Sequence, residues 1–181
     1  MILSSAKRLF RRFRGDTKAT VTVEFAILMP LFFMLLTSTV ELGMVVLRQS
    51  QLERALDIAV RNIRLTTGSA PQHDVVRDQI CDLSGFIDNC STSLRLEMVQ
   101  LDPFAWVDVN EQVDCISKPE EVLPVRGFSN TGRSNDLMLI RACMRFKPLF
   151  SGWGFGESLS TADPEGLVSL VAVSAFVQEP K

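Results

Sequence analysis

The stretch "KATVTVEFAILMPLFFMLL", residues 18 to 36, places a single carboxylate, Glu24, at the start of a long apolar run. The run extends from Phe25 to Leu47, 23 residues that contain one further charge, Glu41. A helix of that length, at about 1.5 Å per residue, is roughly 34 Å long and can cross the ~30 Å hydrocarbon core of a bilayer. The sequence therefore predicts one transmembrane helix.

Basic residues before the run give the chain an orientation. Six cations and one acid, Asp16, precede Thr20, and the cations are Lys7, Arg8, Arg11, Arg12, Arg14 and Lys18. The positive-inside rule then places the N-terminus in the cytoplasm and the C-terminal part beyond the inner membrane, in the periplasm. Of 19 basic and 21 acidic residues in all, 13 and 20 remain from Thr20 onward, a formal charge of −7. This acidic balance argues against a nucleic acid partner.

The apolar run differs from the core of an ordinary cleaved signal peptide. Such a core has about 7 to 15 residues and is followed by a small-x-small cleavage site. Here the run is longer, no such site follows it, and the small residue, Ala19, comes before it. A lipoprotein signal is also excluded, because the first cysteine is Cys81.

The order of these features resembles the class III signal of type IV pilin-like proteins. A basic leader is followed by a small residue, then by "TVTVEF", then by an uninterrupted apolar helix. In those proteins a prepilin peptidase cuts on the cytoplasmic side, before the helix. The resemblance implies cleavage after Ala19, so that Thr20 becomes the first residue of the mature chain and Glu24 the fifth, where pilin-like proteins keep a glutamate.

More narrowly, the segment "ATVTVEFAILMPLFFMLLTSTVELGMVV" is similar to the TadE-like family of the tight-adherence (Tad/Flp) pilus system. The similarity lies in "VEFA", a proline a few residues later, and "ELG" toward the far end of the helix. The C-terminal "GLVSLVAVSAFVQEP" resembles the closing strand of that family. Most members have glycine before the cut where this chain has Ala19, which is also small.

Two roles are open for Glu24. In a bundle of helices, its carboxylate can pair with the new α-amino group of a neighbour's Thr20, and such a pair sets the register because unpaired charges are costly there. Alternatively, it lies at the headgroup level, where the helix dipole favours an acid. The leader, Ala19 and "VEF" together favour the assembly role, with Glu24, Phe25, Pro30 and Glu41 as candidate assembly and packing residues.

Two other residues of the run are unusual for a membrane helix, Glu41 and Pro30. Glu41 lies 17 residues beyond Glu24, or about 25 Å along the helix axis. We expect its side chain to extend to water at the periplasmic interface, in preference to a buried pairing role. Pro30 removes one helical hydrogen bond and can kink the helix, which membrane helices tolerate.

Beyond Leu47 the helical period continues with mixed polarity. An amphipathic stalk is indicated by apolar residues at spacings of four, three and four, which are Leu52, Leu56, Ala59 and Ile63. It should end near "TTGSAP", residues 66–71. The sequence thus predicts a leader at 1–19, a transmembrane and stalk helix at 20–67, and a periplasmic α+β head at 68–181.

The head is predicted to be a small antiparallel sheet laid on the stalk helix. "HDVVRDQICDL" is compatible with a short helix, whereas "LRLEMVQL", "DLMLIRACMRF" and "LVSLVAVSAFV" are typical of strands. An irregular, proline-containing stretch occupies residues 102–135. The fold class is therefore α+β with a pilin-like layout.

Four cysteines, Cys81, Cys90, Cys115 and Cys143, follow the apolar run, on the side where disulfides persist. Three connectivities are possible. We favour Cys81 with Cys90, which closes a compact loop, and Cys115 with Cys143, which attaches the irregular stretch to a strand. A zinc site is the rival, but the chain has no C-x-x-C pair and the single histidine, His73, is poorly spaced for one.

Motifs for catalysis are scarce, and the sequence predicts neither enzyme activity nor a cofactor. "GWGFGES", residues 152–158, has the glycines of a phosphate loop without a βαβ context, so a flexible turn is expected. "DVNEQVD", residues 108–114, lacks the glycine and final glutamate of a calcium loop and reads as a solvated acidic loop. There is no G-x-S-x-G motif.

The sequence therefore predicts a pseudopilin or minor pilin that takes part in assembly or initiation of a Tad-type (type IVc) adhesion pilus. The partners implied by the resemblance are the membrane, a prepilin peptidase, other pilins or pseudopilins, and the inner-membrane assembly platform. The alternative is a periplasmic enzyme or binding domain for which the helix is only a tether. Scrambling the apolar sequence distinguishes the two, because a tether tolerates it and a packing helix does not.

Overall fold

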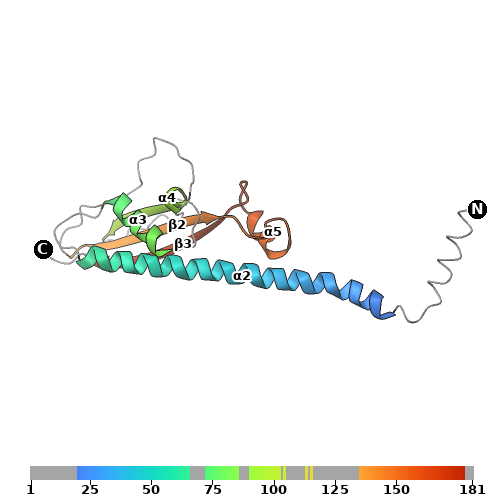
Figure 1. Ribbon diagram of the computed structural model, residues 1–181. Helices are drawn as coiled ribbons and strands as arrows, with labels where there is room; N and C mark the ends of the chain where they lie inside the picture. Colours follow the sequence, from blue (N-terminus) through green and yellow to red (C-terminus); the bar gives the residue numbers. More distant parts are fainter. Residues whose placement is uncertain are drawn as a thin grey trace, which may run out of the picture.

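The computed structural model describes residues 20–65, 72–85, 90–102, 104, 113, 115 and 135–177. A single long helix, α2 (Thr20–Leu65, 46 residues), carries a small head along its C-terminal half (Figure 1). By length and composition, α2 is the one helix among these residues that could cross a membrane. The predicted α+β class, with a long N-terminal helix and a small antiparallel sheet, is confirmed.

Helix α2 continues from the membrane segment into the stalk without interruption. Pro30 lies inside it, and the helix is continuous on both sides of this residue. The described part of the helix runs to Leu65, and residues 66–71, the "TTGSAP" stretch that was predicted to end it, lie outside the described residues. The leader, Ala19 and residues 105–112 with Asp114 are also outside them.

Three antiparallel strands form the sheet of the head in the order β1-β2-β3. They are β1 (Leu94–Leu101), β2 (Leu137–Phe146) and β3 (Val168–Val177), close to the three predicted strands. In the register, Glu97 lies opposite Arg141, which lies opposite Val173. Successive side chains of a strand point to opposite faces, so these three share the face away from the core.

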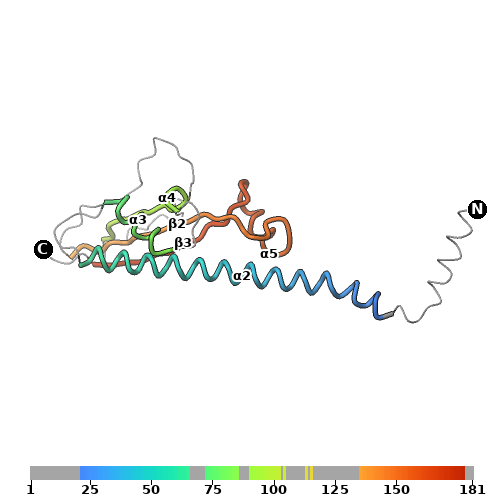
Figure 2. The backbone as a smooth tube through the Cα atoms, in the orientation of Figure 1, coloured from blue at the N-terminus to red at the C-terminus, as the bar shows by residue number. Residues whose placement is uncertain are grey.

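The core lies between the other face of the sheet, α2, and helix α3 (His73–Leu83). Each strand contributes alternate apolar residues to it, as in Met98, Ile140 and Ala172. The stalk contributes the predicted apolar face, and all four of its residues are buried: Leu52, Leu56, Ala59 and Ile63. Burial of one leucine side chain stabilises a fold by about 1.5–3 kcal/mol, so this seam holds the head on the stalk. The tube in Figure 2 follows α2 running beside β3.

Two short helices complete the head, α4 (Cys90–Ser93) and α5 (Gly154–Ser160). The prediction of a flexible turn at 152–158 was wrong, because most of this stretch is helical. The helix starts at Gly154, which has a φ of 64°, a conformation that glycine adopts at little cost. Helix α5 packs against α2, at the end of the head that lies nearest the N-terminal half of α2 (Figure 1).

Candidate assembly site

The N-terminal part of α2 has no cover from the head. We call residues 21–36 the bare segment, because every side chain in it is exposed except the partly exposed Met29. Its large exposed hydrophobics are Val21, Val23, Phe25, Ile27, Leu28, Leu31, Phe32, Phe33, Met34, Leu35 and Leu36. An apolar surface of this length requires lipid or other apolar helices around it.

The candidate assembly residues at the start of the helix all lie on the bare segment. Glu24, Phe25 and Pro30 are exposed. A carboxylate on an otherwise apolar helical surface is costly in lipid unless it reaches the headgroups or finds a partner. The structure therefore leaves the side chain of Glu24 available to a neighbouring molecule.

Glu41 differs from the expectation of a side chain extended to water. It is 1% exposed, and its carboxylate lies under the turn that follows β2. Oε1 accepts a hydrogen bond from the backbone N–H of Leu149 at 3.1 Å, and Oε2 accepts one from Phe150 at 2.9 Å. The prediction was wrong because the partners are 108 and 109 residues away in sequence, beyond the reach of any local pattern.

A carboxylate is well matched to this turn. Each oxygen accepts one backbone N–H, and hydrogen bonds to a carboxylate are stronger than those between neutral groups. We call the interaction of Glu41 with the N–H groups of Leu149 and Phe150 the Glu41 bracket. It joins the membrane end of the head to α2.

Two glycines let α5 approach the bracket. A Cβ on Gly156 would lie 2.5 Å from the carbonyl oxygen of Phe150 and 3.4 Å from Glu41 Oε2. A Cβ on Gly154 would lie 3.1 Å from Ser38 Oγ of α2. A larger residue at Gly156 would collide with the turn at Phe150, and one at Gly154 would crowd Ser38 of α2. "GFG" is therefore a close-packing motif, a role that sequence reasoning missed.

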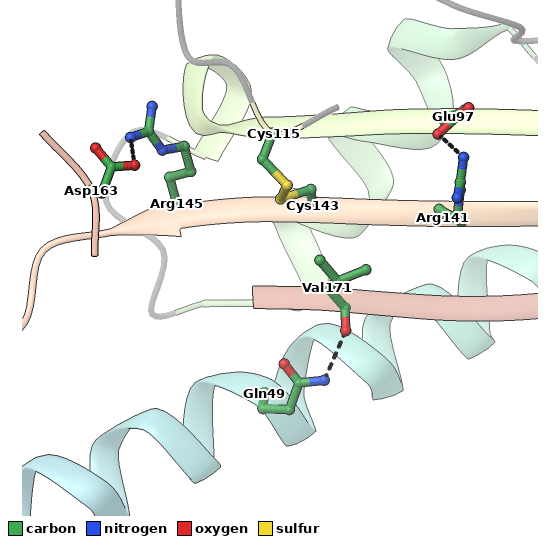
Figure 3. Close-up of a disulfide and its surroundings, with 8 residues drawn as sticks. All are labelled: Gln49, Glu97, Cys115, Arg141, Cys143, Arg145, Asp163 and Val171. Atoms are coloured by element: carbon green, nitrogen blue, oxygen red, sulfur yellow. Dashed lines mark hydrogen bonds and ion pairs between the residues drawn. A yellow bond between two sulfur atoms is a disulfide. The ribbon is translucent and has the colours of Figure 1, made fainter. Parts of the chain in front are cut away.

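Further along the helix, two polar contacts attach the sheet. Gln49 Nε2 donates to the carbonyl oxygen of Val171 at 3.0 Å, which satisfies a backbone acceptor on strand β3 (Figure 3). The guanidinium of Arg48 lies 4.4 Å from the ring centroid of Phe146 on β2. Cation–π contacts of this kind contribute about 0.5–1 kcal/mol at exposed sites. The head is thus fixed to α2 at several levels.

The structure contains the two disulfides favoured from the sequence. Cys81 is bonded to Cys90, with Cα atoms 5.6 Å apart, and links the end of α3 to α4. Cys115 is bonded to Cys143 of β2, with Cα atoms 5.4 Å apart. Figure 3 shows this second bond on the side of the sheet away from α2. It anchors residue 115 to the central strand.

Charged pairs lie on the same outer face of the sheet. Arg141 Nη2 of β2 lies 2.6 Å from Glu97 Oε2 of β1, its cross-strand neighbour, and the guanidinium is largely buried. Arg145 pairs with Asp163 (Figure 3) and with Glu165, both in the connection between α5 and β3. These pairs hold the strands and that connection together.

The single histidine lies at a surface pair. His73 Nδ1 is 3.1 Å from Asp74 Oδ1, and Arg77 is 3.1 Å from the same oxygen. The hydrogen bond from His73 and, second, the charge of Arg77 lower the pKa of Asp74 below its ordinary value. Within the described ranges no group of three or more histidine, cysteine or acidic residues is placed to hold a metal ion.

These features define a class of protein: a small α+β head carried on one long N-terminal helix that is apolar at its start. Residues 19–61 match the family model described as TadE-like protein, which confirms the resemblance to that family of Tad pilus components. The match includes "VEFA", Pro30 and "ELG", and with the apolar helix it indicates a single-pass membrane protein. No curated protein and no solved structure matches the chain.

Proposed function

We propose that this protein is a pseudopilin or minor pilin that takes part in the assembly or initiation of a Tad-type adhesion pilus. The observation that carries the proposal is the bare segment, which bears Glu24 at its start and lies within the part of the chain that matches the TadE-like family. Lipid covers this surface before assembly, and helices of other pilins cover it afterwards. Its partners are therefore the membrane, other pilins or pseudopilins and the inner-membrane assembly platform.

The proposed orientation places the N-terminus in the cytoplasm and the head in the periplasm. Six basic residues before Thr20 support the first part. The two disulfides of the head support the second, because disulfides persist in the oxidising periplasm and are rare in the cytosol. A prepilin peptidase then reaches the bond after Ala19 from the cytoplasmic side.

The proposed role of Glu24 is to set the register between neighbouring helices. Cleavage after Ala19 creates a positive α-amino group at Thr20, four residues from Glu24 in the same chain. In a bundle, the Glu24 carboxylate of one molecule pairs with the α-amino group of the next. Removal of one partner from a desolvated pair costs roughly 3–5 kcal/mol, more than a hundredfold in association.

Glu24→Gln tests this role, because glutamine keeps the shape of the side chain and removes its charge. We expect normal membrane insertion and abundance, with a loss of crosslinking to other pilin-like subunits and of pilus-dependent adherence. The matched control is Asp57→Asn, which removes one exposed carboxylate from the stalk part of the same helix. Normal crosslinking and adherence in Glu24→Gln, at matched protein level, would leave the helix as a tether and reject the assembly role.

A further inference from the structure

Three apolar side chains are exposed together at the end of the head that is nearest the bare segment. Leu149 is 61% exposed, Trp153 46% and Phe155 36%. They lie within seven residues, in the turn after β2 and in the first turn of α5. We call these three residues the α5 surface.

Two contacts fix the position of the α5 surface along the axis of α2. The Glu41 bracket holds the N–H groups of Leu149 and Phe150, and Gly154 lies against Ser38. Glu41 is 20 residues beyond Val21, where the bare segment starts, which corresponds to about 30 Å of helix. The hydrocarbon core is also ~30 Å thick. If the hydrocarbon core begins at Val21, the α5 surface lies at its boundary on the side of the head.

The helix itself is still apolar at this level. Large hydrophobic side chains of α2 are exposed on both sides of Glu41 along the helix, and they are Val40, Leu42, Val46 and Leu47. The α5 surface therefore lies at the same level along the α2 axis as exposed apolar residues of α2 itself. Figure 1 shows the same arrangement, with α5 as the part of the head closest to the N-terminal half of α2.

We propose that the α5 surface is a membrane-interface anchor, and that its partner is the lipid bilayer at the boundary between acyl chains and headgroups. Tryptophan is enriched at that depth, because its ring is apolar and its N–H finds a polar partner. Three side chains are also far fewer than the 20–30 residues a side that a standard protein interface uses. The anchor sets the height of the head on the membrane. The inference rests on α2 spanning a bilayer and is independent of a role in pili.

Quenching of tryptophan fluorescence by brominated lipid measures the depth of the anchor. The chain has two tryptophans, Trp106 and Trp153, so Trp106→Phe leaves Trp153 as the sole reporter. The full-length variant is reconstituted into phosphatidylcholine vesicles that carry bromine at either a shallow or a deep acyl position. We expect Trp153 to lose emission to bromine, more to the shallow position than to the deep one.

Two control variants each carry a single tryptophan at another position, and in both of them Trp106 and Trp153 are replaced by phenylalanine. Phe32→Trp places the reporter on the bare segment and should be quenched most by deep bromine. Val173→Trp places it on an exposed position of β3, on the outer face of the sheet, and should retain its emission. Both leaflets carry bromine, so the direction of insertion does not matter.

The anchor is rejected if Trp153 retains its emission in both kinds of vesicle while Phe32→Trp is quenched. That result would mean that the α5 surface stands clear of lipid. Since the vesicles contain no other pilus component, neither result bears on the assembly role of Glu24. Crosslinking of Glu24→Gln in cells tests that role separately.

Discussion

At the scale of single residues, Glu41 shows how an acid can be retained inside an apolar stretch. Both of its oxygens accept backbone N–H groups, so the charge is solvated by the turn that follows β2. The "ELG" that helps to define the family resemblance thus contains a residue that joins the membrane helix to the head. Glu24 and Glu41 look alike in the sequence, yet the first is exposed and the second is buried.

Glu41→Gln should therefore destabilise the protein. Glutamine has one acceptor oxygen, so its amide NH₂ would face the N–H of either Leu149 or Phe150 and leave that partly buried donor without an acceptor. Such a group costs about 1–3 kcal/mol. The measurement is the midpoint of denaturant unfolding in detergent, with Asp57→Asn as the control. An unchanged midpoint for Glu41→Gln would mean that the bracket contributes nothing to the stability of the head.

At the scale of elements, sequence reasoning succeeded wherever the signal is local. The alternation of "LRLEMVQL" and the helical spacing of Leu52 and Leu56 follow from which face each element buries, and the structure has both. It failed at 152–158 because α5 is seven residues long and starts with two glycines in three positions. The two glycines lie where a Cβ would meet Ser38 and Phe150, which are outside the segment, so no pattern within it encodes this packing.

The same distinction applies to the site. Glu24, Phe25 and Pro30 could be selected from the sequence, because the leader and the apolar run are contiguous with them. The partners of Glu41 and of Gln49 are more than a hundred residues away, so these contacts emerge only when the head folds onto α2. The sequence therefore indicated the candidate residues, but their long-range partners could not be predicted from it.

The two disulfides should differ in their contribution to stability. Cys115–Cys143 closes a separation of 28 residues and Cys81–Cys90 one of nine. In the chain-entropy account, the cost of loop closure grows with the logarithm of loop length, so the longer loop stabilises by about 1 kcal/mol more. We expect the double variant Cys115→Ser/Cys143→Ser to unfold at lower denaturant than Cys81→Ser/Cys90→Ser.

Peptide mapping under non-reducing conditions provides the control for that comparison. Wild-type protein should release Cys81 linked to Cys90 and Cys115 linked to Cys143. Each double variant should keep the other pair intact. If the two variants unfold at the same denaturant concentration, loop length does not determine how much each disulfide stabilises the protein.

At the scale of the whole molecule, charge and apolar surface are divided along the chain. Six of the 19 basic residues precede Thr20, the bare segment follows, and the acidic remainder includes the head. In the proposed orientation, a leader with that charge holds the N-terminus on the cytoplasmic side during insertion. While the leader remains attached, Thr20 has a peptide nitrogen in place of a charged α-amino group, so the proposed pair with the Glu24 of a neighbour lacks its cation. Removal of the leader is therefore required for the proposed register.

Processing should consequently leave a mature N-terminus at Thr20. We expect mass spectrometry of membrane-bound protein to find this terminus in cells with an active prepilin peptidase and Met1 in cells without one. Ala19→Trp should block the cut, because a bulky ring does not fit a pocket for a small residue. That variant should insert normally and resemble Glu24→Gln in assembly, since each lacks one partner of the same pair. An intact leader in cells that assemble pili would separate assembly from cleavage and remove the α-amino group as the partner of Glu24.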